Sequence, residues 1–256
     1  MLLARVPASM SMSEQQISIR TKDGTCQAWV FTPEGKGKWP AVIVYMDGFG
    51  IRPAMKQMGA GLAAHGYVVL LPDLYYRLGP YAPLVPKEVL KGDFRAVVGP
   101  MMASTSNLKA AEDTAAFLAS LDARADVAGK KVGTVGFCMG GGMALTAAGR
   151  YPDRIAAAAS FHGGRLATDE PASPHLVFSK IKAEVYVAGA DMDSGYPPEM
   201  ARRVEAELAK GGVRHKCEIY EGKRHGWMKP DMPVYDAEAA ERGWKELYAL
   251  YARALK

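Results

Sequence analysis

The stretch Thr-Val-Gly-Phe-Cys-Met-Gly-Gly-Gly, residues 134–142, constrains the fold more than any other part of this chain. It predicts a short apolar strand, a sharp turn centred on Cys138, and the start of an Ala-rich helix. The glycines two residues before and after Cys138 leave room for that helix and for a neighbouring strand. Such a turn pushes the thiol out at the end of a sheet, beside free helix N–H groups that favour an anionic sulfur.

Strand and helix patterns alternate along the rest of the chain. Continuous or alternating apolar runs predict strands at 17–20, 26–32, 41–46, 66–71, 131–135, 155–161, 184–188 and 216–220. Helical patterns are found at 53–65, 107–121, 139–150, 198–210 and 234–255, with Asn107 as the expected N-cap of the second helix. The proline-rich region 75–107 is expected to be a long functional loop.

This order of elements predicts the α/β fold class. We expect one domain over residues 15–256, with a mostly parallel sheet, helices on both faces and an antiparallel N-terminal edge. Residues 1–14 are expected to be a flexible leader.

Composition constrains the cellular compartment and the kinds of partner that we expect. The three cysteines, Cys26, Cys138 and Cys217, are odd in number and widely separated, which argues against a disulfide framework or a zinc site and favours the cytoplasm. The net charge of +5 comes without a basic run interleaved with aromatic residues, so nucleic acid is not an expected partner. No apolar stretch has transmembrane length. We expect no metal, no cofactor and no membrane association, and either a monomer or a small homo-oligomer.

A nucleophile at such a turn needs a base and a group that orients the base. His225 lies in a glycine-flanked loop after the last predicted strand, and chain order favours it over His65 and His162. Asp191 follows the predicted strand 184–188 and is the expected acid, with Asp193 as the alternative. Either aspartate also suits the cap of a turn.

An acyl-transfer site also needs donors for a developing oxyanion. The N–H of Met139, directly after the nucleophile, is the first expected donor. The second is expected from Gly48, in the Asp-Gly-Phe-Gly segment that follows the predicted strand 41–46.

Together these motifs resemble the dienelactone hydrolase (carboxymethylenebutenolidase) family of the α/β-hydrolase superfamily. The resemblance runs from about residue 17 to the end, and its anchors are residues 47–50, 67–75, 136–141, 189–191 and His225. It implies a Cys-His-Asp triad on Cys138, His225 and Asp191. It also implies hydrolysis of a small ester or lactone through a thioester acyl-enzyme, in the degradation of aromatic compounds.

Four further residues have expected roles, and the resemblance assigns three of them, those of Asp47, Arg77 and Lys229. Asp47 stands where the family has a glutamate that contacts the resting thiol, so it either gates the thiol or braces the loop. Arg77 matches an arginine that binds the substrate carboxylate, Lys229 is the nearest match to a second one, and Trp227 is a third expected substrate contact. The resemblance thus implies a preference for anionic lactones, weakened because Lys229 offers a point charge in place of an arginine's planar fork and also suits a solvated loop charge.

Two other functions remain open on the sequence alone. One is a promiscuous cysteine-dependent esterase or thioesterase on the same fold. The other is a redox-reactive thiol protein without enzymatic activity, which would not need an ordered histidine and aspartate.

Overall fold

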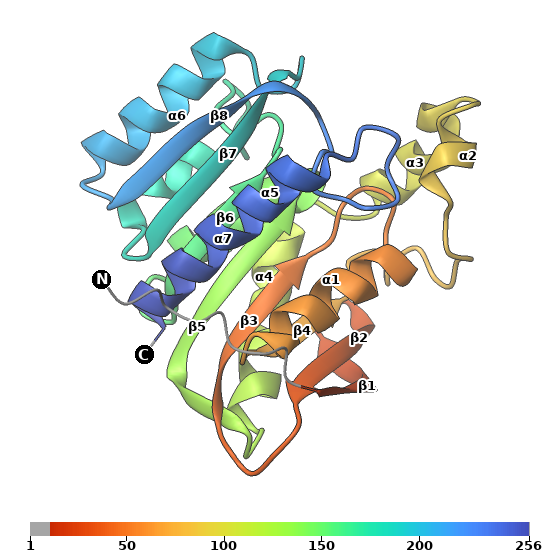
Figure 1. The fold of residues 1–256 in the computed structure, drawn as a ribbon, viewed down its shortest axis with the longest axis vertical. Helices are drawn as coiled ribbons and strands as arrows, with labels where there is room; N and C mark the ends of the chain where they lie inside the picture. The colour runs from red at the N-terminus through yellow and green to blue at the C-terminus, as the bar shows by residue number, and fades with distance from the viewer. Residues whose placement is uncertain (1–10, 256) are drawn as a thin grey trace.

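The structure is a computed structural model and describes residues 11–255. Within that range the strands are β1 (Met12–Thr21), β2 (Gly24–Pro33), β3 (Trp39–Tyr45), β4 (Val68–Pro72), β5 (Val127–Phe137), β6 (Ile155–Phe161), β7 (Glu184–Met192) and β8 (His215–Arg224). They form one sheet in the order β1-β2-β4-β3-β5-β6-β7-β8 (Figure 1). The β1–β2 and β2–β4 pairs are antiparallel, and all the other neighbours are parallel.

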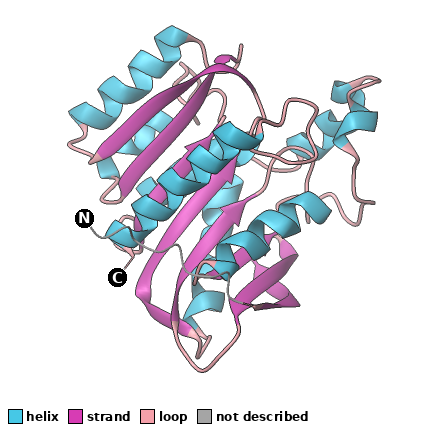
Figure 2. Cartoon of the chain, in the orientation of Figure 1, coloured by secondary structure: helices cyan, strands magenta, loops and turns pink. Residues whose placement is uncertain are grey.

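Helices cover both faces of this sheet (Figure 2). They are α1 (Pro53–Ala64), α2 (Pro86–Val89), α3 (Phe94–Ala103), α4 (Asn107–Asp122), α5 (Met139–Arg150), the 3₁₀ helix η1 (Pro174–Lys180), α6 (Pro198–Lys210) and α7 (Ala237–Ala254). The helices α1 and α7 lie on one face, and α4 and α5 lie on the other (Figure 1). The short helices α2 and α3 stand beyond one end of the sheet.

The central strands are apolar because both of their faces are covered. All five residues of β4 are buried, as are residues 41–45 of β3 and 132–137 of β5. Small residues let α5 approach the sheet closely, and residues 140–149 of that helix are all buried. The core is therefore continuous beneath the end of β5, where Cys138 follows.

The predicted fold class is confirmed, and the differences concern boundaries. β1 begins at Met12, where it pairs with Pro33, so three residues of the expected leader lie in a strand; residues 1–10 lie outside the described range. The expected long loop contains α2 and α3. Ser106, rather than Asn107, is the N-cap of α4, because its Oγ accepts a hydrogen bond from the N–H of Lys109 at 3.1 Å. None of the helices between residues 11 and 255 is long and apolar enough to cross a membrane.

Candidate active site

Cys138 occupies a strained turn between β5 and α5. Its backbone has φ 57° and ψ −118°, in the region that non-glycine residues rarely adopt. A Cβ at Gly136 would lie 1.8 Å from the carbonyl oxygen of Gly140, and one at Gly140 would lie 2.1 Å from that of Tyr45. The two glycines are therefore required for α5 to start this close to β3 and β5.

Cys138, His225 and Asp193 form a continuous hydrogen-bonded chain, named here the reactive cluster. The Nε2 atom of His225 lies 2.8 Å from the Sγ of Cys138, and its Nδ1 lies 2.6 Å from Oδ2 of Asp193. Asp193 is held in turn by the N–H of Gly195, which donates to Oδ1 at 2.8 Å. The side chain of Asp193 is only 5% exposed, so its bond to the imidazole is shielded from water.

The structure places Asp193, rather than the expected Asp191, against His225. Asp191 is exposed, and its Oδ2 accepts a hydrogen bond from the N–H of Gly222 at 2.9 Å. The reason is the length of β7, which continues to Met192 and pairs there with Arg224. Asp191 therefore still belongs to the strand, and Asp193 is the first residue beyond it.

The reactive cluster favours a charge-separated pair. Burial alone would raise the pKa of the Cys138 thiol, but the charge and hydrogen bond of His225 outweigh it and lower that pKa below its usual 9.0. Burial opposes protonation of His225, yet the facing sulfur and Asp193 raise its pKa to about 10. The two groups titrate as a coupled pair, and both shifts favour thiolate beside imidazolium near neutral pH.

Two other cysteines and two other histidines lie in different surroundings. Burial raises the pKa of the Cys26 thiol, and it raises that of Cys217 to about 12. His65 hydrogen-bonds the Gly61 carbonyl and stacks on a tyrosine of α7. His162 is fully buried behind His225, with ring centroids 5.3 Å apart, and burial holds its pKa well below the usual value.

The expected oxyanion donors lie on fixed backbone. Met139 is the first residue of α5, so its N–H has no partner within the helix. The Gly48 carbonyl accepts a hydrogen bond from the Tyr75 hydroxyl at 2.8 Å, and the N–H of Phe49 donates to Oδ1 of Asp47. These bonds hold the loop without using the Gly48 N–H.

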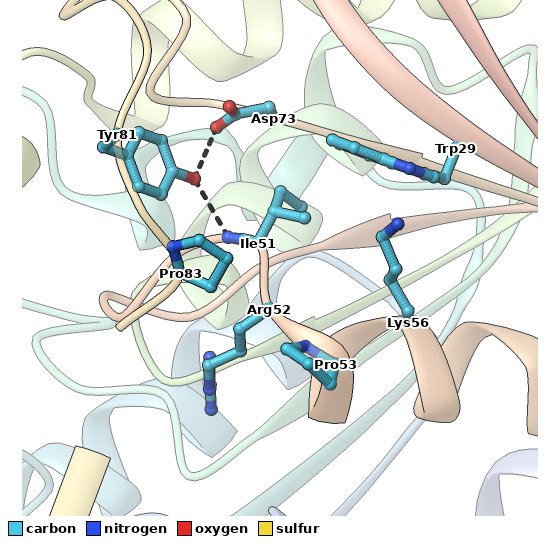
Figure 3. A pocket seen from close by; sticks show the side chains of 8 residues that line it. All are labelled: Trp29, Ile51, Arg52, Pro53, Lys56, Asp73, Tyr81 and Pro83. Carbon is cyan, nitrogen blue, oxygen red and sulfur yellow. Dashed lines mark hydrogen bonds between the residues drawn. The ribbon is translucent and has the colours of Figure 1, made fainter. Parts of the chain in front are cut away.

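Figure 3 shows how the same loop is held from its other side. The Tyr81 hydroxyl accepts from the N–H of Ile51 and donates to Oδ1 of Asp73, both at 2.9 Å. These groups line a depression of about 470 Å³ together with Trp29, Arg52, Pro53, Lys56 and Pro83. Cys138 and His225 are not among its lining residues.

Asp47 is the centre of a second set of charges, named here the loop cluster: Asp47, Arg52, Lys229 and Asp231. Arg52 binds both carboxylate oxygens of Asp47, at 2.7 and 2.9 Å, and reaches Asp231 at 2.6 Å. The Nζ of Lys229 lies 2.5 Å from Oδ2 of Asp47. Burial opposes ionisation of Asp47, but Lys229 and Arg52 outweigh it and lower its pKa. Within the described chain Asp47 makes no hydrogen bond to Cys138, which is the geometry of the loop-bracing alternative.

The structure does not bring Arg77 or Trp227 to Cys138. Arg77 binds Asp113 through two hydrogen bonds of 2.9 Å and Asp23 at 2.7 Å, and it lines neither pocket beside Cys138. Trp227 is fully buried and stacks on Tyr220 with ring centroids 4.7 Å apart. Neither expected substrate contact lines a pocket beside Cys138 in this structure, because local partners already occupy both side chains.

Two pockets open beside Cys138 and share Cys138, His225 and Met102. The first, named here the apolar pocket, measures about 510 Å³ and is lined by Gly48, Phe49, Leu90, Phe94, Met102, Cys138, Met192, Arg224, His225, Lys229, Met232, Pro233 and Val234. The second, about 430 Å³, is lined by more polar groups, among them Thr105, Ser106, Asn107, Arg165 and Glu170. Between residues 11 and 255, no group of three or more His, Cys, Asp or Glu side chains gathers as a metal site would require.

Sequence reasoning missed several of these neighbours. Arg52 and Asp47 carry opposite charges at the two ends of a Gly-Phe-Gly loop, which is a signal that such reasoning can use. Asp231 has no comparable signal, because it lies 179 residues from Arg52. The same holds for Phe94 and Met102, which reach the site from a region expected to be a loop.

A cysteine at a strand–turn–helix elbow, with a histidine and a carboxylate beyond later strands of the same sheet, is the arrangement found in the α/β-hydrolase class. The model of the "Dienelactone hydrolase family" matches residues 26–255. This chain therefore belongs to the dienelactone hydrolase family, as the motifs predicted, and is a hydrolase of ester or lactone bonds.

Known proteins similar to this chain agree with that placement. A protein of Synechocystis sp. named "Putative carboxymethylenebutenolidase" is 26% identical over 245 residues, covering 94% of this chain and 96% of that protein. One of the same name from Methylorubrum extorquens is 29% identical over 236 residues, covering 91% and 78%. The crystal structure of a "Putative Dienelactone Hydrolase" from Klebsiella pneumoniae superposes with a TM-score of 0.83 at 22% identity, covering 94% of this chain and 99% of that one, which shows a shared fold.

Proposed function

We propose that this protein hydrolyses small carboxylic esters or lactones with Cys138 as the nucleophile, through a thioester acyl-enzyme. The observation that supports the proposal is the chain of short contacts from Sγ of Cys138 through His225 to Asp193. A redox-sensing thiol has no need of this ordered base and carboxylate, so hydrolysis is the better account.

The first half of the reaction forms the acyl-enzyme. The Cys138 thiolate attacks the carbonyl carbon, and the resulting oxyanion accepts hydrogen bonds from the Gly48 and Met139 N–H groups. When the tetrahedral intermediate collapses, the bond to the leaving oxygen breaks and the His225 imidazolium gives its proton to that oxygen. The leaving alcohol or enol departs, and Cys138 remains acylated.

The second half regenerates the resting pair. Neutral His225, held in one tautomer by Asp193, takes a proton from a water molecule as that water attacks the thioester. Collapse expels the Cys138 thiolate and the carboxylic acid, and the imidazolium is formed again. An enol leaves readily with little acid assistance, whereas an amine does not, so esters and lactones suit this site better than peptides.

The test compares the wild type with Cys138→Ala and Cys138→Ser on cis- and trans-dienelactones, neutral 4-nitrophenyl esters and acyl thioesters. Cys138→Ala is expected to lose measurable turnover of every substrate that the wild type hydrolyses. Circular dichroism and the unfolding midpoint should match the wild type, since only one partly exposed sulfur is removed. Full activity in Cys138→Ala would rule out the nucleophile, and turnover of thioesters alone would indicate a thioesterase.

We also infer a cytoplasmic location. Cys26, Cys138 and Cys217 are all free thiols, and a thiol nucleophile stays active only where it is kept reduced. Fractionation of cells that produce the tagged full-length chain tests the inference, and enrichment in a membrane or secreted fraction would contradict it.

A further inference from the structure

We propose that the apolar pocket receives an uncharged, apolar or aromatic portion of the substrate, so that the protein prefers neutral esters to anionic lactones. This inference rests on the proposed function, because it names the substrate class that Cys138 attacks. It replaces the anionic substrate expected from the family resemblance.

The walls of the apolar pocket favour hydrocarbon and aromatic groups. Phe49 and Phe94 meet edge to face with ring centroids 5.5 Å apart. Met102 and Met232 line the same space, which reaches Cys138. Aromatic rings and thioethers both make favourable contacts with an aromatic ligand and adapt to irregular hydrocarbon shapes.

Lys229, a buried cation among the residues that line this pocket, is already paired with a carboxylate. Its Nζ lies 2.5 Å from Asp47, and it is only 1% exposed. The loop cluster as a whole contains two cations and two carboxylates, so it carries no surplus positive charge. The ring of Phe49 covers two of these groups, 5.4 Å from Nζ of Lys229 and 5.5 Å from the guanidinium carbon of Arg52. A substrate carboxylate entering here would lose its hydration and meet a charge cluster with no net positive charge.

Arg77 and Arg224 do not supply the missing positive charge to the apolar pocket either. Arg77 is bound to Asp113 and Asp23, outside the pocket. Arg224 lines the pocket but is exposed to water, where its attraction for an anion is screened. The lining therefore selects by apolar contact more than by charge.

The experiment uses two esters of equal chain length. 4-Nitrophenyl hexanoate is neutral, and 4-nitrophenyl hydrogen adipate has the same six-carbon acyl chain with a terminal carboxylate. We expect kcat/KM to be at least about ten-fold higher for the hexanoate, and higher again for 4-nitrophenyl 4-phenylbutanoate. Equal values, or a preference for the adipate, would overturn the inference.

A charge introduced into the wall tests whether this pocket is responsible. Phe94→Arg is expected to move the hexanoate-to-adipate ratio toward the anion by about ten-fold, because a cation then faces the acyl chain. Val97→Arg is the matched control: it lies on the same helix, is 43% exposed and does not line the pocket. An equal shift in both variants would assign the effect to the overall surface charge and contradict the proposal.

A third variant, Arg224→Gln, tests whether Arg224 binds the carboxylate of the adipate ester. A loss confined to the adipate would identify Arg224 as a carboxylate anchor and overturn the inference, whereas similar small changes for both esters support it. Failure of the proposed function gives a different result. If Cys138→Ala hydrolyses these esters as the wild type does, Cys138 is not the nucleophile and the proposed function fails. If Cys138→Ala is inactive but the wild type prefers the adipate, only the proposed substrate class fails.

Discussion

The reactive cluster and the loop cluster lie near each other at the end of the sheet. They differ in whether they leave an atom available to a ligand. The reactive cluster ends on the sulfur of Cys138, which opens into two pockets. The charged groups of the loop cluster bind one another instead: both oxygens of Asp47 accept hydrogen bonds, and Arg52 bridges two carboxylates. A charged residue next to a nucleophile is therefore not a substrate site by proximity alone. What decides its role is whether its partners leave an atom for the ligand.

The largest expected effect separates the two candidate acids of the reactive cluster. Asp193→Asn is expected to lower kcat/KM by roughly 10²–10⁴-fold, because His225 loses the group that orients it and stabilises its positive charge. Asp191→Asn should change it by less than about three-fold, since Asp191 holds only the Gly222 backbone. Steady-state ester hydrolysis measures both. A larger loss in Asp191→Asn would restore the acid predicted from the sequence.

In the loop cluster the main expected effect is on stability. Asp47→Asn leaves Arg52 and Lys229, each 1% exposed, without their shared carboxylate, and should lower the free energy of unfolding by about 3–5 kcal/mol. Asp231→Asn is the control, expected to cost about 1–2 kcal/mol because Asp47 still binds Arg52. Urea unfolding at neutral pH measures these values. Equal costs in the two variants would show that Asp47 is not the centre of the cluster.

The pH dependence of the Asp47 effect has a definite sign. Because the pKa of Asp47 is lowered in the folded protein, its stabilising contribution is complete above its unfolded pKa of about 4. The contribution is lost as the pH falls through the lower folded value. The stability gap between wild type and Asp47→Asn should therefore narrow in acid, and a gap that widens would contradict the ion pairing.

A third prediction concerns the state of the thiol. In the wild type, iodoacetamide should alkylate Cys138 at a lower pH than an ordinary thiol requires, because His225 lowers the thiol pKa. His225→Asn removes that charge and leaves burial, so alkylation at pH 7 should slow by at least about ten-fold and its midpoint should move upward. Cys26 and Cys217 serve as internal controls, since their pKa values are raised and they should react slowly in both proteins. An unchanged profile would mean that His225 does not set the charge of the sulfur.

The smallest effect is expected at Arg77, which belongs to neither cluster. Arg77→Gln should leave the ratio of kcat/KM for neutral and anionic esters within about two-fold of the wild type. It should still lower the unfolding midpoint, because Asp113 is buried and loses its bidentate partner. A strong loss of activity on anionic esters alone would return Arg77 to the substrate site.

Sequence periodicity and turn chemistry predicted most of the sheet and the elbow at Cys138, and chain order pointed to His225, whose Nε2 lies 2.8 Å from that sulfur. These succeed because apolar runs, glycine spacing and chain order are local properties of the sequence. Asp193 contacts His225 in place of the expected Asp191 because of a strand boundary. The strand expected to end at residue 188 continues to Met192, because its last residue still pairs with Arg224 in β8. That pairing decides which of the two aspartates, Asp191 or Asp193, can reach His225.

The substrate contacts were harder to predict for a different physical reason. Arg77 and Lys229 matched positions of a family motif, but their roles depend on partners brought in by the fold. Arg77 meets Asp113, 36 residues away, and Lys229 meets Asp47 from the opposite end of the chain. The charge of a side chain can be read from the sequence, whereas whether that charge is already paired depends on tertiary structure.

Acylation of Cys138 during ester hydrolysis can be detected by rapid-quench mass spectrometry. The wild type is mixed with a 4-nitrophenyl ester, quenched in acid within the first turnover and digested, and the peptides are analysed. We predict one acyl group on the peptide that contains Cys138, accumulating in step with a burst of nitrophenol and absent from Cys138→Ala. Steady hydrolysis with no adduct on Cys138, or an adduct on another residue, would contradict the account.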